Sequence, residues 1–253
     1  MNQKQIYNKI VKDKENQIKG LAILLDPDKI DFETLPDLIH DCILNKISYF
    51  FVGGSLITNH QLADLIGFIK KYCDIPVVLF PGNSLHIEPS ADAILLLSLI
   101  SGRNPEFLIG HHVISAPILR KSGLEIISTG YILVDSGKQT TVSYISNTTP
   151  LPHDKPEIAA CTAMAGEMLG MSLIYLDGGS GAKYPISAEM IAKVKQSVEL
   201  PIIVGGGINS IEKAKTAFEA GADIVVIGNK IEQDPNFISD IGKLVNNFQS
   251  ILV

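Results

Sequence analysis

The sequence predicts a (β/α)8 barrel, and three observations favour this fold. Eight short apolar stretches, each the length of a buried strand, alternate with segments of helical spacing. Strands that alternate with helices form a parallel sheet, and eight such units close a barrel rather than an open sheet. The chain length of 253 residues is that of one such barrel. We therefore expect one domain over residues 1–253.

The first half of the chain contains four of the expected strands. A leading helix over 4–19, with Ile6, Ile10 and Ile18 at helical spacing, is expected to close the bottom of the barrel. Short apolar runs predict strands at 20–25, 49–52, 76–80 and 93–99, and helices are expected at 32–45 and 62–72. Residues 84–92 are fewer than the roughly 10 that a crossover helix needs. The third outer helix is therefore expected to be missing or replaced by an irregular stretch.

The second half continues the alternation. Strands are expected at 125–134, 173–177, 201–204 and 224–227, and helices at 105–121, 158–169, 187–198, 211–220 and 237–251. Gly123 follows the first of these helices and suits its C-terminal cap. The polar segment 136–157, rich in threonine and proline, is either a lid that contacts substrate or a plain surface loop.

Composition excludes several classes of protein. With 46% apolar and 19% charged residues the chain reads as a soluble globular protein, and its longest apolar run is far shorter than a membrane span. The N-terminus lacks the apolar core of a secretory signal, so we expect a cytoplasmic location. The net charge of −6 disfavours nucleic-acid binding. Cys42, Cys73 and Cys161 are far apart and are expected to be unpaired, buried thiols.

Acids and glycines follow the expected strands, at the rim where barrels of this kind place their chemistry. Asp26 follows the first strand, Ser55 the second, and Asp177 ends the sixth. Glycine-rich turns follow the sixth, seventh and eighth strands. One such turn alone is equally consistent with a tight loop. Three on adjacent strands indicate a phosphate site, because glycines leave backbone N–H groups free to face an anion.

Asp26 lies across the expected barrel mouth from these glycine loops. Mg²⁺ prefers one or two protein oxygens together with phosphate oxygens and water, so Asp26 is well placed to hold it, with Ser55 as a second oxygen. Asp28 is better explained as an acid that caps the following helix. His60, His111 and His112 have no carboxylate or thiol at zinc spacing and are not expected to bind metal.

Six motifs in order carry a resemblance to a known family. They are LLDPDK at 24–29, FVGGS at 51–55, LFPGN at 79–83, YLDGGSGA at 175–182, VGGGI at 204–208 and GADIVVIGN at 221–229. With them the chain resembles the geranylgeranylglyceryl phosphate synthase family, including its bacterial heptaprenylglyceryl phosphate synthase relatives. The resemblance implies a Mg²⁺-dependent prenyltransferase of phospholipid biosynthesis. Such an enzyme joins sn-glycerol 1-phosphate to a long prenyl diphosphate, here expected to be geranylgeranyl diphosphate, and releases diphosphate.

The resemblance also implies roles for individual residues. Asp26 and Ser55 are the expected Mg²⁺ ligands, and Asp177 is expected to accept a proton from the attacking hydroxyl or to orient it. The residues expected to contact glycerol phosphate are Tyr175, Leu176, Asp177, Gly178, Gly179, Ser180, Gly181, Gly206, Gly207, Gly228 and Asn229. Many members carry Glu at the position of Asp177, and some carry Lys at that of Leu24. The resemblance also implies a homo-oligomer. Transient contact with a membrane surface is expected because the product is a lipid.

Two alternatives share the glycine loops. One is another phosphosugar barrel, such as an isomerase, epimerase or aldolase, which needs a different acid–base pair or a Schiff-base lysine. Lys183 is near the loops but is expected to be exposed. The other is a barrel that binds a phosphorylated ligand without catalysis, which the presence of both Asp26 and Asp177 disfavours.

Overall fold

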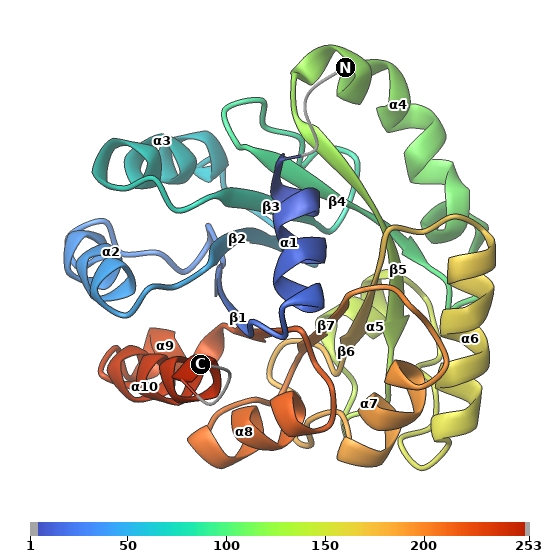
Figure 1. Ribbon diagram of the computed structural model, residues 1–253. Helices are drawn as coiled ribbons and strands as arrows, with labels where there is room; N and C mark the ends of the chain where they lie inside the picture. The colour runs from blue at the N-terminus through green and yellow to red at the C-terminus, as the bar shows by residue number, and fades with distance from the viewer. Residues whose placement is uncertain (1–4, 251–253) are drawn as a thin grey trace.

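The computed structural model describes residues 5–250 and shows a closed ring of parallel strands in sequence order, with helices around it (Figure 1). The ring closes because β1 pairs with both β2 and β8. The strands are β1 (Gly20–Leu25), β2 (Tyr49–Gly54), β3 (Val77–Pro81), β4 (Ala93–Leu99), β5 (Glu125–Leu133), β6 (Leu173–Asp177), β7 (Ile202–Gly205) and β8 (Ile224–Ile227). The predicted (β/α)8 barrel is confirmed.

The predicted helices fall close to their expected positions. The helices are α1 (Gln5–Glu15), α2 (Leu35–Leu44), α3 (Leu62–Tyr72), the π-helical turn η1 (Glu106–Gly110), α4 (His111–Ser122), α5 (Thr141–Ile145), α6 (Pro156–Met168), α7 (Ala188–Lys195), α8 (Ile211–Glu219), α9 (Asn229–Gln233) and α10 (Phe237–Ser250). The first, however, ends at Glu15 and not at 19, and the short helices α5 and α9 were not predicted. Gly123 caps α4 in the left-handed conformation, with φ of 83°, as predicted. Residues 4 and 251, where the first and last helices were predicted to begin and end, lie outside the described residues.

The core has two layers because neighbouring residues of a strand point to opposite faces. Tyr49 and Phe51 belong to the layer inside the barrel, and Phe50 belongs to the layer between the strands and the outer helices. Ile6 and Ile10 of α1 pack onto the inner layer, so α1 closes the barrel at the N-terminal ends of the strands, as predicted (Figure 1).

Between β3 and β4, residues 84–92 form turns and no helix, which confirms the predicted loss of one outer helix. Asp92 anchors the end of this segment: its Oδ2 accepts a hydrogen bond from Val77 N at 2.8 Å, and its own backbone N donates to Val77 O at 2.9 Å. Ile94 and Leu96, on the outer face of β4, therefore line a cavity instead of packing beneath a helix.

Three expectations need correction. The second helix begins at Leu35 and not at 32, because Pro36 is favoured only in a first turn. Asp28 therefore caps no helix, and its carboxylate instead accepts hydrogen bonds from Thr58 and Asn59 of the neighbouring loop. The cysteines are unpaired, but only Cys42 is buried: Cys73 is half-buried, and Cys161 is exposed on the side of α6 away from the barrel.

Candidate active site

A polar cavity lies at the C-terminal rim of the barrel. Most of the residues predicted from strand ends line it together: Asp26, Ser55, Tyr175, Asp177, Gly179, Ser180, Gly181, Gly206, Gly207, Gly228 and Asn229. These residues come from the ends of five strands. Because the strands form a closed ring, motifs that are far apart in the sequence line one cavity.

Leu176 and Gly178 do not line the cavity. The Leu176 side chain is fully buried in the layer between strands and helices, because it alternates with Tyr175 and Asp177 along β6. Gly178 donates its backbone N–H to Gly205 O at 3.1 Å and so joins the loops after β6 and β7.

Asp177 is buried beneath the glycine loops. Tyr131 donates its hydroxyl to Asp177 Oδ2, and the Gly179 backbone N donates to Oδ1 at 2.8 Å. Burial raises the pKa of Asp177, and these two hydrogen bonds oppose the rise. Burial, together with the neighbouring Asp177, raises the pKa of Tyr131 well above its usual value, so Tyr131 keeps its proton and donates it. Nothing in the sequence pattern distinguishes Tyr131, whose role follows from its register opposite Tyr175.

The turn after β7 needs glycine at position 206. Gly206 has a φ of +82°, and a Cβ there would lie 2.6 Å from Gly178 N and 2.8 Å from Asp177 Oδ1. A side chain at 206 therefore displaces either the neighbouring loop or the buried carboxylate. Asn229 holds the same wall from the other side, since its Oδ1 accepts a hydrogen bond from Ser180 Oγ at 3.2 Å.

Gly206→Ala is expected to lower both the free energy of unfolding and the affinity for a phosphate ligand. A non-glycine residue in this backbone region costs on the order of 1–3 kcal/mol, and the clash adds to that cost. Urea unfolding and calorimetric titration with glycerol phosphate measure the two effects. Gly67→Ala is the matched control, because Gly67 lies within α3 with open space around it and alanine there is expected to stabilise by about 0.5–1 kcal/mol. Unchanged stability and binding in Gly206→Ala contradict this account.

Asp26 and Ser55, the two predicted Mg²⁺ ligands, follow adjacent strands and both line the polar cavity. Asp26 Oδ1 accepts a hydrogen bond from Asp28 N at 3.1 Å. A Cβ added to Gly54 would lie 3.8 Å from both Asp26 oxygens, so glycine keeps the space beside this carboxylate open. Within residues 5–250 no group of three or more His, Cys, Asp or Glu side chains is arranged for a metal ion. One carboxylate and one hydroxyl fit Mg²⁺ that shares phosphate ligands, and do not fit a cage made of protein alone.

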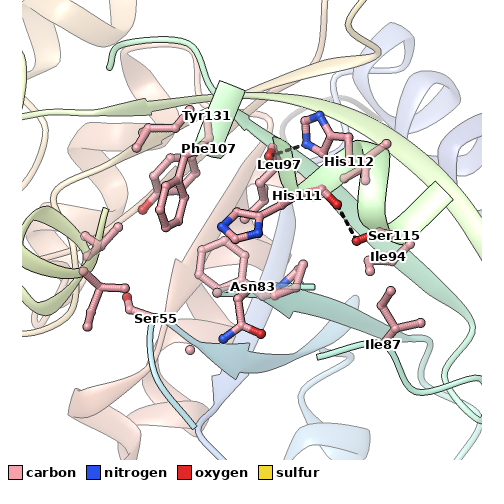
Figure 2. A pocket seen from close by; sticks show the side chains of 18 of the residues that line it. Ser55, Asn83, Ile87, Ile94, Leu97, Phe107, His111, His112, Ser115 and Tyr131 are labelled. Atoms are coloured by element: carbon pink, nitrogen blue, oxygen red, sulfur yellow. Dashed lines mark hydrogen bonds between the residues drawn. The ribbon is translucent and has the colours of Figure 1, made fainter. Parts of the chain in front are cut away.

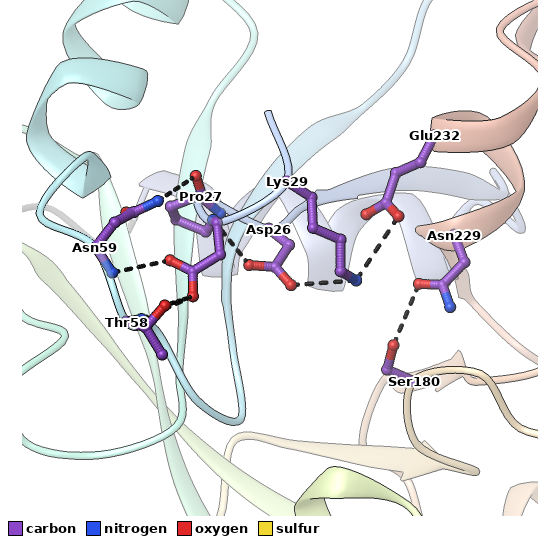
Figure 3. Close-up of polar contacts among 9 residues, drawn as sticks. Asp26, Pro27, Lys29, Thr58, Asn59, Ser180, Asn229 and Glu232 are labelled. Carbon is purple, nitrogen blue, oxygen red and sulfur yellow. Dashed lines mark hydrogen bonds and ion pairs between the residues drawn. The ribbon is translucent and has the colours of Figure 1, made fainter. Parts of the chain in front are cut away.

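Three charged side chains of this cavity, those of Lys29, Lys230 and Glu232, were not singled out from the sequence. Lys29 Nζ lies 3.2 Å from Asp26 Oδ2 and 3.7 Å from Glu232 Oε2 (Figure 3). Burial raises the pKa of Glu232; Lys29 opposes the rise and Asp26 adds to it. Glu232 belongs to α9, a helix too short to show helical spacing in the sequence.

An apolar cavity adjoins the polar one (Figure 2). It lies between β3, β4 and α4, where the missing helix leaves space. Its walls are largely apolar side chains: Phe80, Ile87, Ile94, Leu96, Leu97, Leu99, Phe107, Leu119, Val142 and Ile145. Gly54, Ser55 and Phe80 line both cavities, so the two meet beside Asp26.

His111 and His112 both make contacts within the protein. His112 Nε2 lies 2.8 Å from Leu97 O, and the His111 ring packs edge-on against Phe107. Both histidines line the apolar cavity. Lys183 is exposed, as predicted, with its ammonium 5.0 Å from the centre of the Tyr184 ring and outside the polar cavity. The cavity therefore offers no Schiff-base lysine at that position.

Comparison with known proteins decides the family. The model of the PcrB family matches residues 10–245. The chain belongs to the PcrB family. Among its relatives, a protein of Spirosoma linguale named geranylgeranylglyceryl phosphate synthase is 59% identical over 235 residues, covering 93% of this chain and 94% of the relative. A protein of the same name from Flavobacterium johnsoniae is 51% identical and covers 92% and 96% of the two chains.

Solved structures of other proteins are also similar to this chain. The crystal structure of (S)-3-O-geranylgeranylglyceryl phosphate synthase from Thermoplasma acidophilum, in complex with sn-glycerol-1-phosphate, superposes with a TM-score of 0.90 at 30% identity over 99% of both chains. A tryptophan synthase alpha chain from Legionella pneumophila, at 16% identity and a TM-score of 0.57, shares the fold alone. The resemblance inferred from the six motifs is confirmed, and with it the assignment of the chain to the prenyltransferase enzymes.

Proposed function

We propose that this chain forms an ether bond between sn-glycerol 1-phosphate and a long-chain prenyl diphosphate, with Mg²⁺ as cofactor and release of diphosphate. The observation that carries the proposal is the meeting of two unlike cavities at Gly54, Ser55 and Phe80. One has glycine loops and carboxylates suited to a polar phosphate ester, and the other has walls suited to a hydrocarbon tail. The names of the relatives, and the glycerol phosphate bound in one solved relative, support the same assignment.

The acceptor is placed in the polar cavity. Gly206, Gly207 and Gly228 line this cavity, and their loops would offer backbone N–H groups to its phosphate, with Ser180 and Asn229 beside them. The glycerol hydroxyl then lies toward Asp177, whose carboxylate Tyr131 and Gly179 hold in a fixed orientation. The hydrogen bonds from Tyr131 and Gly179 each use one lone pair of the Asp177 carboxylate and fix its orientation. The remaining lone pairs can accept the proton of the glycerol hydroxyl.

The donor is placed across both cavities, with its tail in the apolar one and its diphosphate beside Asp26 and Ser55. The glycerol oxygen attacks the first carbon of the prenyl chain, a C–O ether bond forms, and the bond from that carbon to the diphosphate oxygen breaks. The hydroxyl proton passes to Asp177, and the electron pair leaves with diphosphate. Asp26 and Ser55 would hold Mg²⁺, which would supply positive charge to stabilise the leaving diphosphate. The shared wall keeps both substrates in one orientation.

A direct assay tests the proposal. The purified protein is incubated with labelled glycerol 1-phosphate and prenyl diphosphates of increasing length, with and without Mg²⁺. We expect lipid-soluble labelled product that requires the metal. Absence of product at every chain length contradicts the proposed function.

The apolar cavity is expected to limit the length of the prenyl chain. Ser115 lines it beside Leu119, and Ile94, near the start of β4, marks the end far from the rim. Ser115→Met is expected to lower kcat/KM for the longest accepted donor by about 10-fold or more while sparing shorter donors, since each methylene in an apolar pocket changes discrimination by about 1–3 kcal/mol. Competition assays between two donor lengths measure this ratio. Ile118→Met adds the same side chain to the exposed face of α4 and should leave the ratio unchanged. An unchanged ratio in Ser115→Met assigns the tail to another surface.

Several sequence predictions stay predictions. Within the described residues no helix is both long and apolar enough to cross a bilayer. The cytoplasmic location, the homo-oligomer, the transient membrane contact and the single domain over 1–253 have no test in the structure.

A further inference from the structure

Lys29 lies between two carboxylates at the place where the barrel closes. Its Nζ lies 3.2 Å from Asp26 on the loop after β1 and 3.7 Å from Glu232 on α9, after β8. β1 and β8 are hydrogen-bonded neighbours, so these two loops are adjacent. Figure 3 shows the Lys29 ammonium between the two carboxylates, with Asn229 and Ser180 beyond Glu232. Lys29 thus lies between the predicted cation site and the predicted phosphate site.

The polar cavity contains more carboxylates than ammonium groups, so each free ammonium group matters for binding a phosphate. The carboxylates that line it are Asp26, Asp28, Asp177 and Glu232, and the ammonium groups are those of Lys29 and Lys230. Lys230 is engaged elsewhere, since its Nζ lies 3.0 Å from Asp234 and 5.6 Å from the centre of the Phe237 ring. Such a lining repels phosphate groups unless cations neutralise the carboxylates. Of the two ammonium groups, Lys29 is therefore the one placed to meet a phosphate.

We propose that Lys29 changes partner during the reaction cycle. Without metal it neutralises Asp26. When a divalent cation binds Asp26, the ammonium moves to a phosphate oxygen of the bound diphosphate. The Lys29 ammonium and the divalent cation compete for the Asp26 carboxylate, so binding of the metal weakens the attraction between Lys29 and Asp26. Its side chain is 45% exposed and its stem is flexible, so the movement needs no change of the backbone. This inference rests on the proposed function and adds a residue that contacts the leaving group.

Glu232 acts in this scheme as a positioning residue. Glu232 is farther from Lys29 than Asp26 is. When the metal binds Asp26, Glu232 keeps the Lys29 ammonium near the cavity. The helix that carries Glu232 begins with Asn229, whose side chain accepts the hydrogen bond from Ser180. One short helix therefore holds both the phosphate wall and the lysine partner.

Two binding measurements that need no prenyl transfer test the proposal. The first is Mn²⁺ binding by electron paramagnetic resonance without any phosphate ligand. Lys29→Met removes the competitor and should tighten Mn²⁺ binding by about 3-fold, as expected for loss of a partly exposed ion pair. The second is calorimetric binding of inorganic pyrophosphate at saturating Mg²⁺. The same variant should bind it about 10-fold more weakly, because a hydrogen bond to a charged group is lost. A purely structural role does not move the two affinities in opposite directions.

Lys230→Met is the matched control, because it removes the same charge from the same cavity. Both of its affinities should change by less than about twofold, since its ammonium is paired with Asp234. Glu232→Gln should weaken pyrophosphate binding in the native background and add no further loss in the Lys29→Met background, since coupled residues are not additive.

The proposal is overturned if Lys29→Met leaves Mn²⁺ affinity unchanged or lowers it, if Lys230→Met reproduces both shifts, or if the two losses in pyrophosphate affinity add. These readouts involve neither the tail nor the acceptor. Opposite shifts in a protein that makes no ether product therefore refute the proposed function alone. Ether product from a protein without those shifts refutes the partner exchange alone.

Discussion

Asp26→Asn is expected to abolish prenyl transfer and to leave the barrel folded. Asp26 lies at the rim with its side chain 22% exposed, and it belongs to neither core layer. Asparagine keeps the oxygen that accepts the Asp28 N–H and loses the charge that holds a divalent cation. Removing electrostatic stabilisation of a leaving group typically costs about 10²–10³ in turnover. We expect at least that loss in the labelled-lipid assay.

The control for Asp26→Asn lies in the same loop. Asp31 is exposed, and its Oδ1 accepts the Glu33 N–H at 2.9 Å, so Asp31→Asn makes the same chemical change outside the cavity. Its turnover should stay within about twofold of the native value, as surface substitutions generally do. Thermal unfolding followed by circular dichroism should show a folded barrel for both variants. Native turnover in Asp26→Asn removes Asp26 from the cation site.

Asp177→Asn is expected to lower turnover by about 10²–10⁴, the usual contribution of a general base. Asparagine fits the same space, because Tyr131 can accept a hydrogen bond from the new amide and Gly179 can still donate to its oxygen. The Michaelis constant for glycerol phosphate should change less than kcat. Burial raises the pKa of Asp177, so native turnover should rise with pH as this group ionises, and that rise should be missing from the residual activity of the variant.

The same substitution has a predictable effect on stability. The pKa of Asp177 is higher in the folded chain than its ordinary value of 3.8, so the folded state binds the proton more tightly. Native stability therefore falls as pH rises from 3.8 through the folded pKa, whereas the variant lacks this loss. Urea unfolding of both proteins across that range should show that the free energy of unfolding of the variant increases relative to that of the native chain as the pH rises. A constant difference at all pH values contradicts a raised pKa.

Much of the site was predictable because barrels place their chemistry at strand ends. Asp26, Ser55, Asp177 and the glycine turns each follow an apolar run, so the fold alone brings them together. Leu176 was misplaced within this pattern. It belongs to the motif in sequence, but strand alternation turns its side chain toward the helices.

The remaining site residues depend on tertiary contacts that sequence spacing does not reveal. Tyr131 reaches Asp177 from the neighbouring strand, and the pairing register that aligns them is fixed only when the barrel closes. Glu232 meets Lys29 because the last strand pairs with the first. The apolar cavity was not predictable from its lining, since its residues come from β3, β4, α4 and the 136–157 segment.

Because one outer helix is missing between β3 and β4, the wall of the apolar cavity and the glycine loops can be constrained separately in evolution. Asp92 fixes the end of the segment through two hydrogen bonds with Val77. Residues 84–91 need no helical spacing, and loops of this kind tolerate insertion and deletion. Changes there alter the wall of the apolar cavity and leave the glycine loops on the opposite side of the ring untouched. Tail selectivity can therefore diverge between lineages while acceptor chemistry stays the same.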